Sequence, residues 1–206
     1  MSPLNTLPSA EKFASRMQSL GLGDGSRIVL QQTDGLPSDQ VHSLLEDQAG
    51  RIWIGTSDGL VFLDQQLQLQ QPSAVELHRT PVFALTEREN ELLVGTERGL
   101  YSIATPTSAA ETLLANVPVS ALLQESRDLL WIGTVDRGLL RQRHGITEQL
   151  DIRQGLPNNR ILALLQDNEK SLWVGTNGGV FRLRDAPFTT FTTEQGLAGN
   201  FIRTVL

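Results

Sequence analysis

An internal repeat of about forty residues constrains the fold of this chain more than any other feature of its sequence. Each copy is centred on a phrase in which an aromatic residue or Leu is followed by an aliphatic residue, Gly and Thr. The four copies begin at Trp53, Leu93, Trp131 and Trp173, at intervals of 40, 38 and 42 residues. A polar turn and a Gly with an apolar neighbour follow each copy. Four copies in step predict a fold made of four similar units.

Every unit is predicted to consist of short strands separated by turns. An apolar run begins eleven or twelve residues before each phrase, and its third residue is always small: Ser43, Ala84, Ala121 or Ala163. Strands of about five residues with tight turns favour antiparallel meanders, because a parallel pair needs a longer crossover. We therefore predict an all-β fold, a partial β-propeller of about four four-stranded blades with the apolar run innermost and covered on both faces. Residues 202–206 would begin a fifth blade.

The central phrase also predicts how the blades pack. The aromatic residues Trp53, Trp131 and Trp173 are expected to lie between neighbouring blades. The glycines two positions later, Gly55, Gly133 and Gly175, are expected to let backbones approach closely. Leu93 breaks the aromatic pattern, so its blade is expected to be the least tightly packed.

Composition argues against several classes of function. Seventeen basic and 23 acidic side chains give a net charge of −6, and no stripe of Lys and Arg could follow a nucleic-acid backbone. The absence of Cys excludes disulfides, thiolate metal sites and a Cys nucleophile. No apolar stretch approaches the roughly 18 residues of a membrane span. No catalytic or cofactor motif is recognisable, and His42, His78 and His144 fall at unrelated positions in the repeat, so we expect a non-enzymatic protein without cofactor or metal.

The repeat resembles the two-component regulator propeller repeat. The resemblance rests on Gly35-Leu36-Pro37, Val41, Glu46-Asp47, Gly50, Trp53-Ile54-Gly55-Thr56 and Gly59-Leu60, and it is strongest in the first and fourth copies. It covers roughly residues 32–206. In that family the repeats form sensory ectodomains of bacterial hybrid histidine kinases and diguanylate cyclases, in rings of about seven blades. The resemblance implies a sensing module without its output domain; the family implies the periplasm, whereas the lack of a signal peptide indicates the cytoplasm.

Residues 1–30 differ in character from the repeats that occupy residues 31–206. Ser9 can cap one short amphipathic helix that ends near Gly21, and a strand is expected before residue 31. Residues 7–30 resemble a fragment of a rhodanese-type sulfurtransferase. That chemistry needs a persulfide-forming Cys, so sulfur transfer is excluded. The segment is predicted to be either a fusion remnant or a cap over a blade edge.

Candidate ligand-binding residues follow from the order of the turns. The turns entering the first strand and the turns between the second and third strands should lie at the same end of the propeller. That end would gather Arg79, Arg98, Arg137, Asn158, Asn159, Arg160 and Asn177. Arginines from successive blades could bind a carboxylate, a sulfate or a sugar acid through forked hydrogen bonds. Alternatively, these are turn residues, and the arginines are solvated or paired with Glu97 and Asp136.

Three functions are compatible with this pattern. The first is a non-enzymatic propeller that senses or binds a small molecule or carbohydrate. The second is a structural or protein-interaction module that self-associates, because an open arc exposes two blade faces that a homodimer could cover. The third is a propeller lyase with a metal and a His/Glu pair, which the scattered histidines disfavour.

Overall fold

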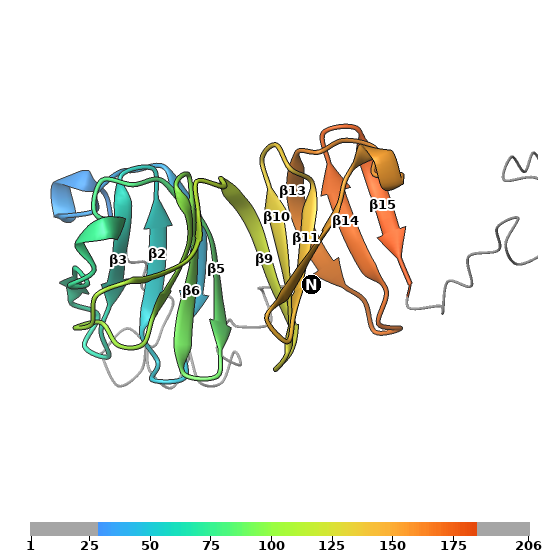
Figure 1. Ribbon diagram of the computed structural model, residues 1–206. Coiled ribbons are helices and arrows are strands. Elements are labelled where there is room, and N and C mark those ends of the chain that lie inside the picture. Colours follow the sequence, from blue (N-terminus) through green and yellow to red (C-terminus); the bar gives the residue numbers. More distant parts are fainter. Residues whose placement is uncertain (1–28, 185–206) are drawn as a thin grey trace, which may run out of the picture.

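The computed structural model describes residues 29–184, and within them the chain forms four antiparallel sheets in succession (Figure 1). The predicted N-terminal helix and the start of a fifth blade lie outside the described residues. The first three sheets have four strands each, and three strands of the fourth are described; in every sheet the strand order follows the chain. This confirms the all-β propeller architecture.

The strands are as follows. Blade 1 contains β1 (Val41–Glu46), β2 (Ile52–Thr56), β3 (Gly59–Leu63) and β4 (Leu69–Gln70); blade 2 contains β5 (Val82–Arg88), β6 (Glu91–Thr96), β7 (Gly99–Ile103) and β8 (Glu111–Ala115). Blade 3 contains β9 (Val119–Ser126), β10 (Leu129–Thr134), β11 (Leu139–Arg143) and β12 (Ile146–Leu150); blade 4 contains β13 (Ile161–Gln166), β14 (Leu172–Thr176) and β15 (Gly179–Leu183). Short 3-10 turns, η2 (Gln32–Asp34), η3 (Val75–Leu77) and η4 (Ile152–Gln154), precede β1, β5 and β13.

The first strand of each blade is innermost, as predicted. β1, β5, β9 and β13 contact one another in chain order and line a central hollow of about 270 Å³. His42 lies on this inner surface, where its Nε2 is 2.8 Å from Ser57 Oγ and its ring meets that of Phe83 edge to face. His42 is exposed on this surface and makes a hydrogen-bond contact there.

The expectation that both faces of the innermost strands are covered is wrong for the two outer blades. Val82 in β5 and Val119 in β9 are fully buried, but Val41 and Leu44 in β1 are 43% and 55% exposed, and Leu162 in β13 is 53% exposed. Strand position decides this difference. β5 and β9 have a blade on either side, whereas β1 and β13 each have one among the described residues.

The core consists of separate apolar clusters between successive blades. Trp53 lies in the cluster between blades 1 and 2, and Trp131 lies in the cluster between blades 3 and 4. Both are buried, so the predicted position of the aromatic residues between blades is confirmed for these two. Leu93 is fully buried in the cluster between blades 2 and 3. The smaller side chain of Leu93 is therefore fully covered by blades 2 and 3.

Candidate functional site

One end of the propeller, here called the entry end, is where the chain enters the first strand of each blade. A repeated backbone hydrogen bond ties this entry to the turn between the second and third strands. The amides of Ser57, Glu97, Val135 and Asn177 donate to the carbonyls of Gln40, Pro81, Pro118 and Arg160, at 3.0 to 3.2 Å. The two sets of turns therefore share one end, as the sequence predicted.

The seven predicted binding residues all lie at the entry end, where most of them shape turns. Asn158 Oδ1 accepts from the amide of Arg160, and Asn159 Oδ1 accepts from the amide of Ile152. Arg137 donates to the carbonyl of Asn116, whose own amide donates to the carbonyl of Arg98. These contacts hold the backbone, and within residues 29–184 no ion pair joins Arg98 or Arg137 to Glu97 or Asp136.

Of the four predicted arginines, Arg79 lines a cavity of the described chain. This cavity, of about 560 Å³, lies beside blade 1 and also exposes Asp34, Asp58 and His78. Arg79 itself has a positive φ of 54°, in a turn where Gly59 pairs with His78. The arginines thus share an end of the propeller, and the predicted common anion site remains a prediction.

Away from the entry end, the same set of three side chains recurs in blades 1, 3 and 4. It consists of a Trp, a carboxylate that accepts its indole N–H and an Arg beside its ring, and we call it the aromatic bracket. In each, a carboxylate six residues before the Trp accepts a hydrogen bond from its indole Nε1: Asp47 at 2.8 Å, Glu125 at 2.6 Å and Asp167 at 2.8 Å. A guanidinium carbon lies 5.1 to 5.8 Å from each ring centroid, from Arg51, Arg141 and Arg182. The hydrogen bond from Trp173 lowers the pKa of Asp167 below its ordinary value. The carboxylates of Asp47 and Asp167 also accept the backbone amides of Arg51 and Ser171, and so close the hairpin turns of blades 1 and 4.

Blade 2 lacks two of the three parts of this bracket, the Trp and the Arg, although Glu87 still stands six residues before Leu93. Leu93 stands in place of the Trp, and Ser102 pairs with it where Arg141 pairs with Trp131 in blade 3. The charges at the hairpin are reversed, because Arg88 lies opposite Glu91 where Asp47 lies opposite Arg51 in blade 1. Leu93 and Ser102 are much smaller than the Trp and Arg of the other blades, so they fill less of the contact between blades 2 and 3.

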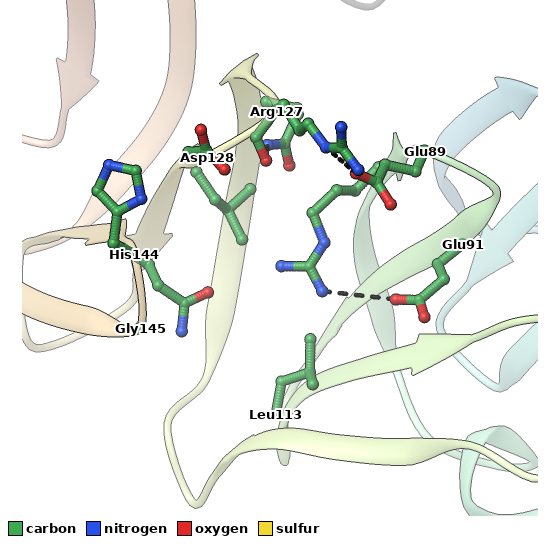
Figure 2. Close-up of a pocket in the computed structure, with 11 residues that line it drawn as sticks. Glu89, Glu91, Leu113, Arg127, Asp128, His144 and Gly145 are labelled. Carbon is green, nitrogen blue, oxygen red and sulfur yellow. Dashed lines mark hydrogen bonds and ion pairs between the residues drawn. The ribbon is translucent and has the colours of Figure 1, made fainter.

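A pocket of about 450 Å³ also lies between blades 2 and 3, although neither Leu93 nor Ser102 lines it (Figure 2). Trp53 of blade 1 packs in one cluster with Leu92 and Ile103 of blade 2, which pair with each other. The equivalent pair in blade 3 is Leu130 and Gln142, and both line the pocket. By strand register, two residues that line the pocket therefore correspond to residues that pack with Trp53 between blades 1 and 2. We call this pocket the blade 2–3 pocket.

The hairpins of the two blades place charged side chains around this pocket. Figure 2 shows Glu89 and Glu91 on one side, Asp128 and His144 on the other, and Arg127 reaching to Glu89. Arg127 Nε donates to Glu89, and Arg88 Nη2 lies 3.4 Å from Glu91 Oε2. The side chain of Arg127 is 79% exposed, so this pair adds little to stability and its groups are accessible to a ligand. Gln124 Oε1, on the pocket lining, is buried and accepts no hydrogen bond.

None of the predicted binding residues lines the blade 2–3 pocket. It lies at the hairpins opposite the entry end, which the sequence reasoning did not search. The departure at Leu93 singles out blade 2 in the sequence, but by itself it predicts only looser packing of that blade. Within residues 29–184, no group of three or more His, Asp or Glu side chains could hold a metal ion, and no helix is long and apolar enough to cross a membrane.

Comparison with known proteins agrees with the repeat. Residues 35–58 and 155–178 match the model of the two component regulator propeller, so the first and fourth copies are repeats of this kind. None of the curated proteins matches the chain in a sequence comparison.

Solved structures share the fold. The extracellular domain of the hybrid two-component system BT3049 of B. thetaiotaomicron superposes with a TM-score of 0.68 at 21% identity, over 85% of this chain and 25% of that one. The corresponding domain of BT4673 from the same organism gives 0.62 at 24% identity, over 72% and 22%. The computationally designed Ika4 protein gives 0.53 at 18% identity, over 77% and 98%. The chain thus spans about a quarter of the length of the two extracellular domains.

Proposed function

We propose that this chain is a non-enzymatic ligand-binding propeller module of the kind found in two-component sensors, and that it binds its ligand in the blade 2–3 pocket. The two regulator propeller repeats support the sensor class. The single observation that carries the binding role is the pocket between blades 2 and 3, in the blade pair where the Trp and the Arg of the bracket are both replaced.

The lining of the pocket favours a small polar ligand with one acidic group. Leu113 and Leu130 supply an apolar surface for the face of a ring, while Arg88 and Arg127 supply guanidinium donors for a carboxylate or sulfate. The three carboxylates of Glu89, Glu91 and Asp128 are acceptors for hydroxyl groups. An acidic saccharide combines these features. Ligand sites commonly pair a small apolar surface with a few convergent polar groups.

Calorimetric titration and thermal unfolding with acidic and neutral oligosaccharides would test the proposal. A saturating ligand should raise the melting temperature, because binding to the folded state alone stabilises it by about 2.7 kcal/mol at 100 times the Kd. Arg88→Ala and Glu91→Ala should each weaken binding at least tenfold. Arg143→Ala is the matched control, because Arg143 is an exposed residue of the same strand as Gln142 but does not line the pocket.

Two outcomes would contradict different parts of the proposal. Binding that survives both Arg88→Ala and Glu91→Ala would place the ligand elsewhere, and the Arg79 cavity at the entry end would be tested next. A ligand that is released chemically altered, with turnover, would contradict the non-enzymatic role. The absence of any binding by acidic or neutral saccharides would contradict the ligand class.

A further inference from the structure

The three joints between blades share one contact, made by the first residue of each inner strand. Val82, Val119 and Ile161 are all fully buried. A Cβ built on Gly55 would lie 2.7 Å from Val82 Cγ1, one on Gly95 would lie 2.7 Å from Val119 Cγ1, and one on Gly133 would lie 2.6 Å from Ile161 Cγ2. The β-branched side chain of one blade therefore sits where the Gly of the preceding blade has no side chain.

Blade 4 offers the same receiving surface, and no described residue covers it. A Cβ on Gly175 would meet nothing closer than Ala163 of its own blade, at 3.7 Å. Val180, which pairs with Gly175, is 67% exposed, whereas Leu60, Leu100 and Leu139 at the same position of the other blades are fully buried. We call the surface formed by Trp173, Gly175 and Val180 the terminal face.

The sequence after blade 4 repeats the segment that covers this face in the other blades. Before blade 4, Asp151 caps η4, Gln154 completes the capping box, Gly155 ends the turn with φ 104°, and Leu156 enters the core between blades 3 and 4. The same types of residue recur as Thr192, Gln195, Gly196 and Leu197. Gly196 precedes Ile202 by six positions, as Gly155 precedes Ile161. The spacing from Leu183 to Ile202 also equals that from Leu63 to Val82.

We propose that residues 192–206 bind the terminal face of blade 4, with Ile202 seated over Gly175 and Leu197 in the position that Leu156 takes one blade earlier. The exposed Val41 of a second copy could compete for the terminal face, because Val41 has the same position in its repeat as Ile202. A tethered segment has the advantage, since a short linker gives it a millimolar effective concentration that a second copy does not reach in dilute solution.

A single thiol placed on the terminal face would test this in the full chain, which has no Cys of its own. In the Val180→Cys variant, bound residues 192–206 should cover the thiol and slow its reaction with a maleimide at least tenfold. Adding Ile202→Asp should restore the fast rate, because a carboxylate cannot be seated against Gly175 without a large desolvation cost. Val41→Cys is the matched control and should react rapidly with or without Ile202→Asp. Circular dichroism of each variant should match that of the parent chain.

The outcomes separate the occupants. Slow labelling that Ile202→Asp reverses, and that is unchanged by tenfold dilution of the protein, supports binding by the chain's own segment. Equally fast labelling of Val180→Cys with and without Ile202→Asp would overturn the proposal. Protection that disappears on dilution and extends to Val41→Cys would overturn it as well, in favour of association between copies.

Discussion

At the scale of single residues, two carboxylates at hairpin ends have pKa values that folding shifts in opposite directions. Asp167 accepts the indole N–H of Trp173, which lowers its pKa. Glu87, near the joint between blades 1 and 2, has no such donor; burial raises its pKa above the ordinary value, and the amide of Gln48 offsets this only in part, at 3.4 Å. The pKa of one acidic residue is therefore lowered and that of the other is raised, so their contributions to stability change with pH in opposite directions.

Trp173→Phe is expected to raise the pKa of Asp167, because the ring is kept but the N–H donor is lost. A carboxyl whose pKa is lowered by folding stabilises the protein above its unfolded pKa and loses that contribution as the pH falls through the folded value. The variant should therefore lose less stability than the parent between neutral and acidic pH. Titration of the Asp167 carboxyl carbon by NMR measures this directly. Asp151, whose lowered pKa comes from Arg153, should be unchanged.

Glu87→Gln is expected to stabilise the protein at pH 7. A raised folded pKa means that the contribution of Glu87 to stability is present below its unfolded pKa and is lost as the pH rises through the folded value. The amide keeps an acceptor for Gln48 and has no charge to bury. Urea unfolding should show a gain at pH 7 that shrinks toward pH 4, while Glu111→Gln, at an exposed position of β8, should show none. A loss of stability at pH 7 would contradict this account.

At the scale of strands, the position of a residue in the repeat matters less than whether a neighbouring blade covers it. Val119 and Val41 are the first residues of β9 and β1, yet the first is fully buried and the second is 43% exposed. The sequence pattern predicts the same burial for both residues, because their position in the repeat shows which strand they begin but not whether another blade covers that strand.

Val119→Ala should cost about 1–3 kcal/mol of unfolding free energy, since two buried carbons are removed from a joint packed against Gly95. Val41→Ala should cost less than about 0.5 kcal/mol, because its side chain is already solvated. Chemical denaturation of the two variants checks the difference. Equal losses would mean that a neighbour covers Val41 in solution.

The blade order, the innermost strands and the joint positions of Trp53 and Trp131 could be predicted from sequence, because each depends on a pattern within one repeat. The blade 2–3 pocket could not, because it depends on register across two blades: Arg88 and Leu113 lie on one side, and Leu130 and Gln142 lie on the other. The entry end was predicted correctly as a location. Hydrogen bonds within the turns hold the backbone amide of Arg98 and the side chain of Arg137, and the repeat pattern does not contain these contacts.

At the scale of the whole molecule, each blade packs mainly on its neighbours in the chain, and the apolar clusters lie at successive joints. Stability in such arrangements approximates a sum of unit and nearest-neighbour terms. The two blades with described neighbours on both sides, blades 2 and 3, should therefore resist opening most strongly.

Native-state hydrogen exchange should show this as a gradient. Amides of β6 and β10 should exchange most slowly, and those of β1 and β2 should exchange faster, through local opening of blade 1. Exchange of all four strands at one common rate under mildly destabilising conditions would instead mean that the described blades open as a single unit.

The joint between blades has a consequence for how chains of this kind can change in length. Every repeat carries both unlike halves of the contact, a β-branched residue at the start of its inner strand and a Gly in its second strand, such as Val119 and Gly133 in blade 3. An in-frame duplication or loss of one whole repeat therefore leaves every remaining interface with a matching partner. Blade number is free to drift between descendants of one ancestral gene, while the chemistry of each individual joint stays the same.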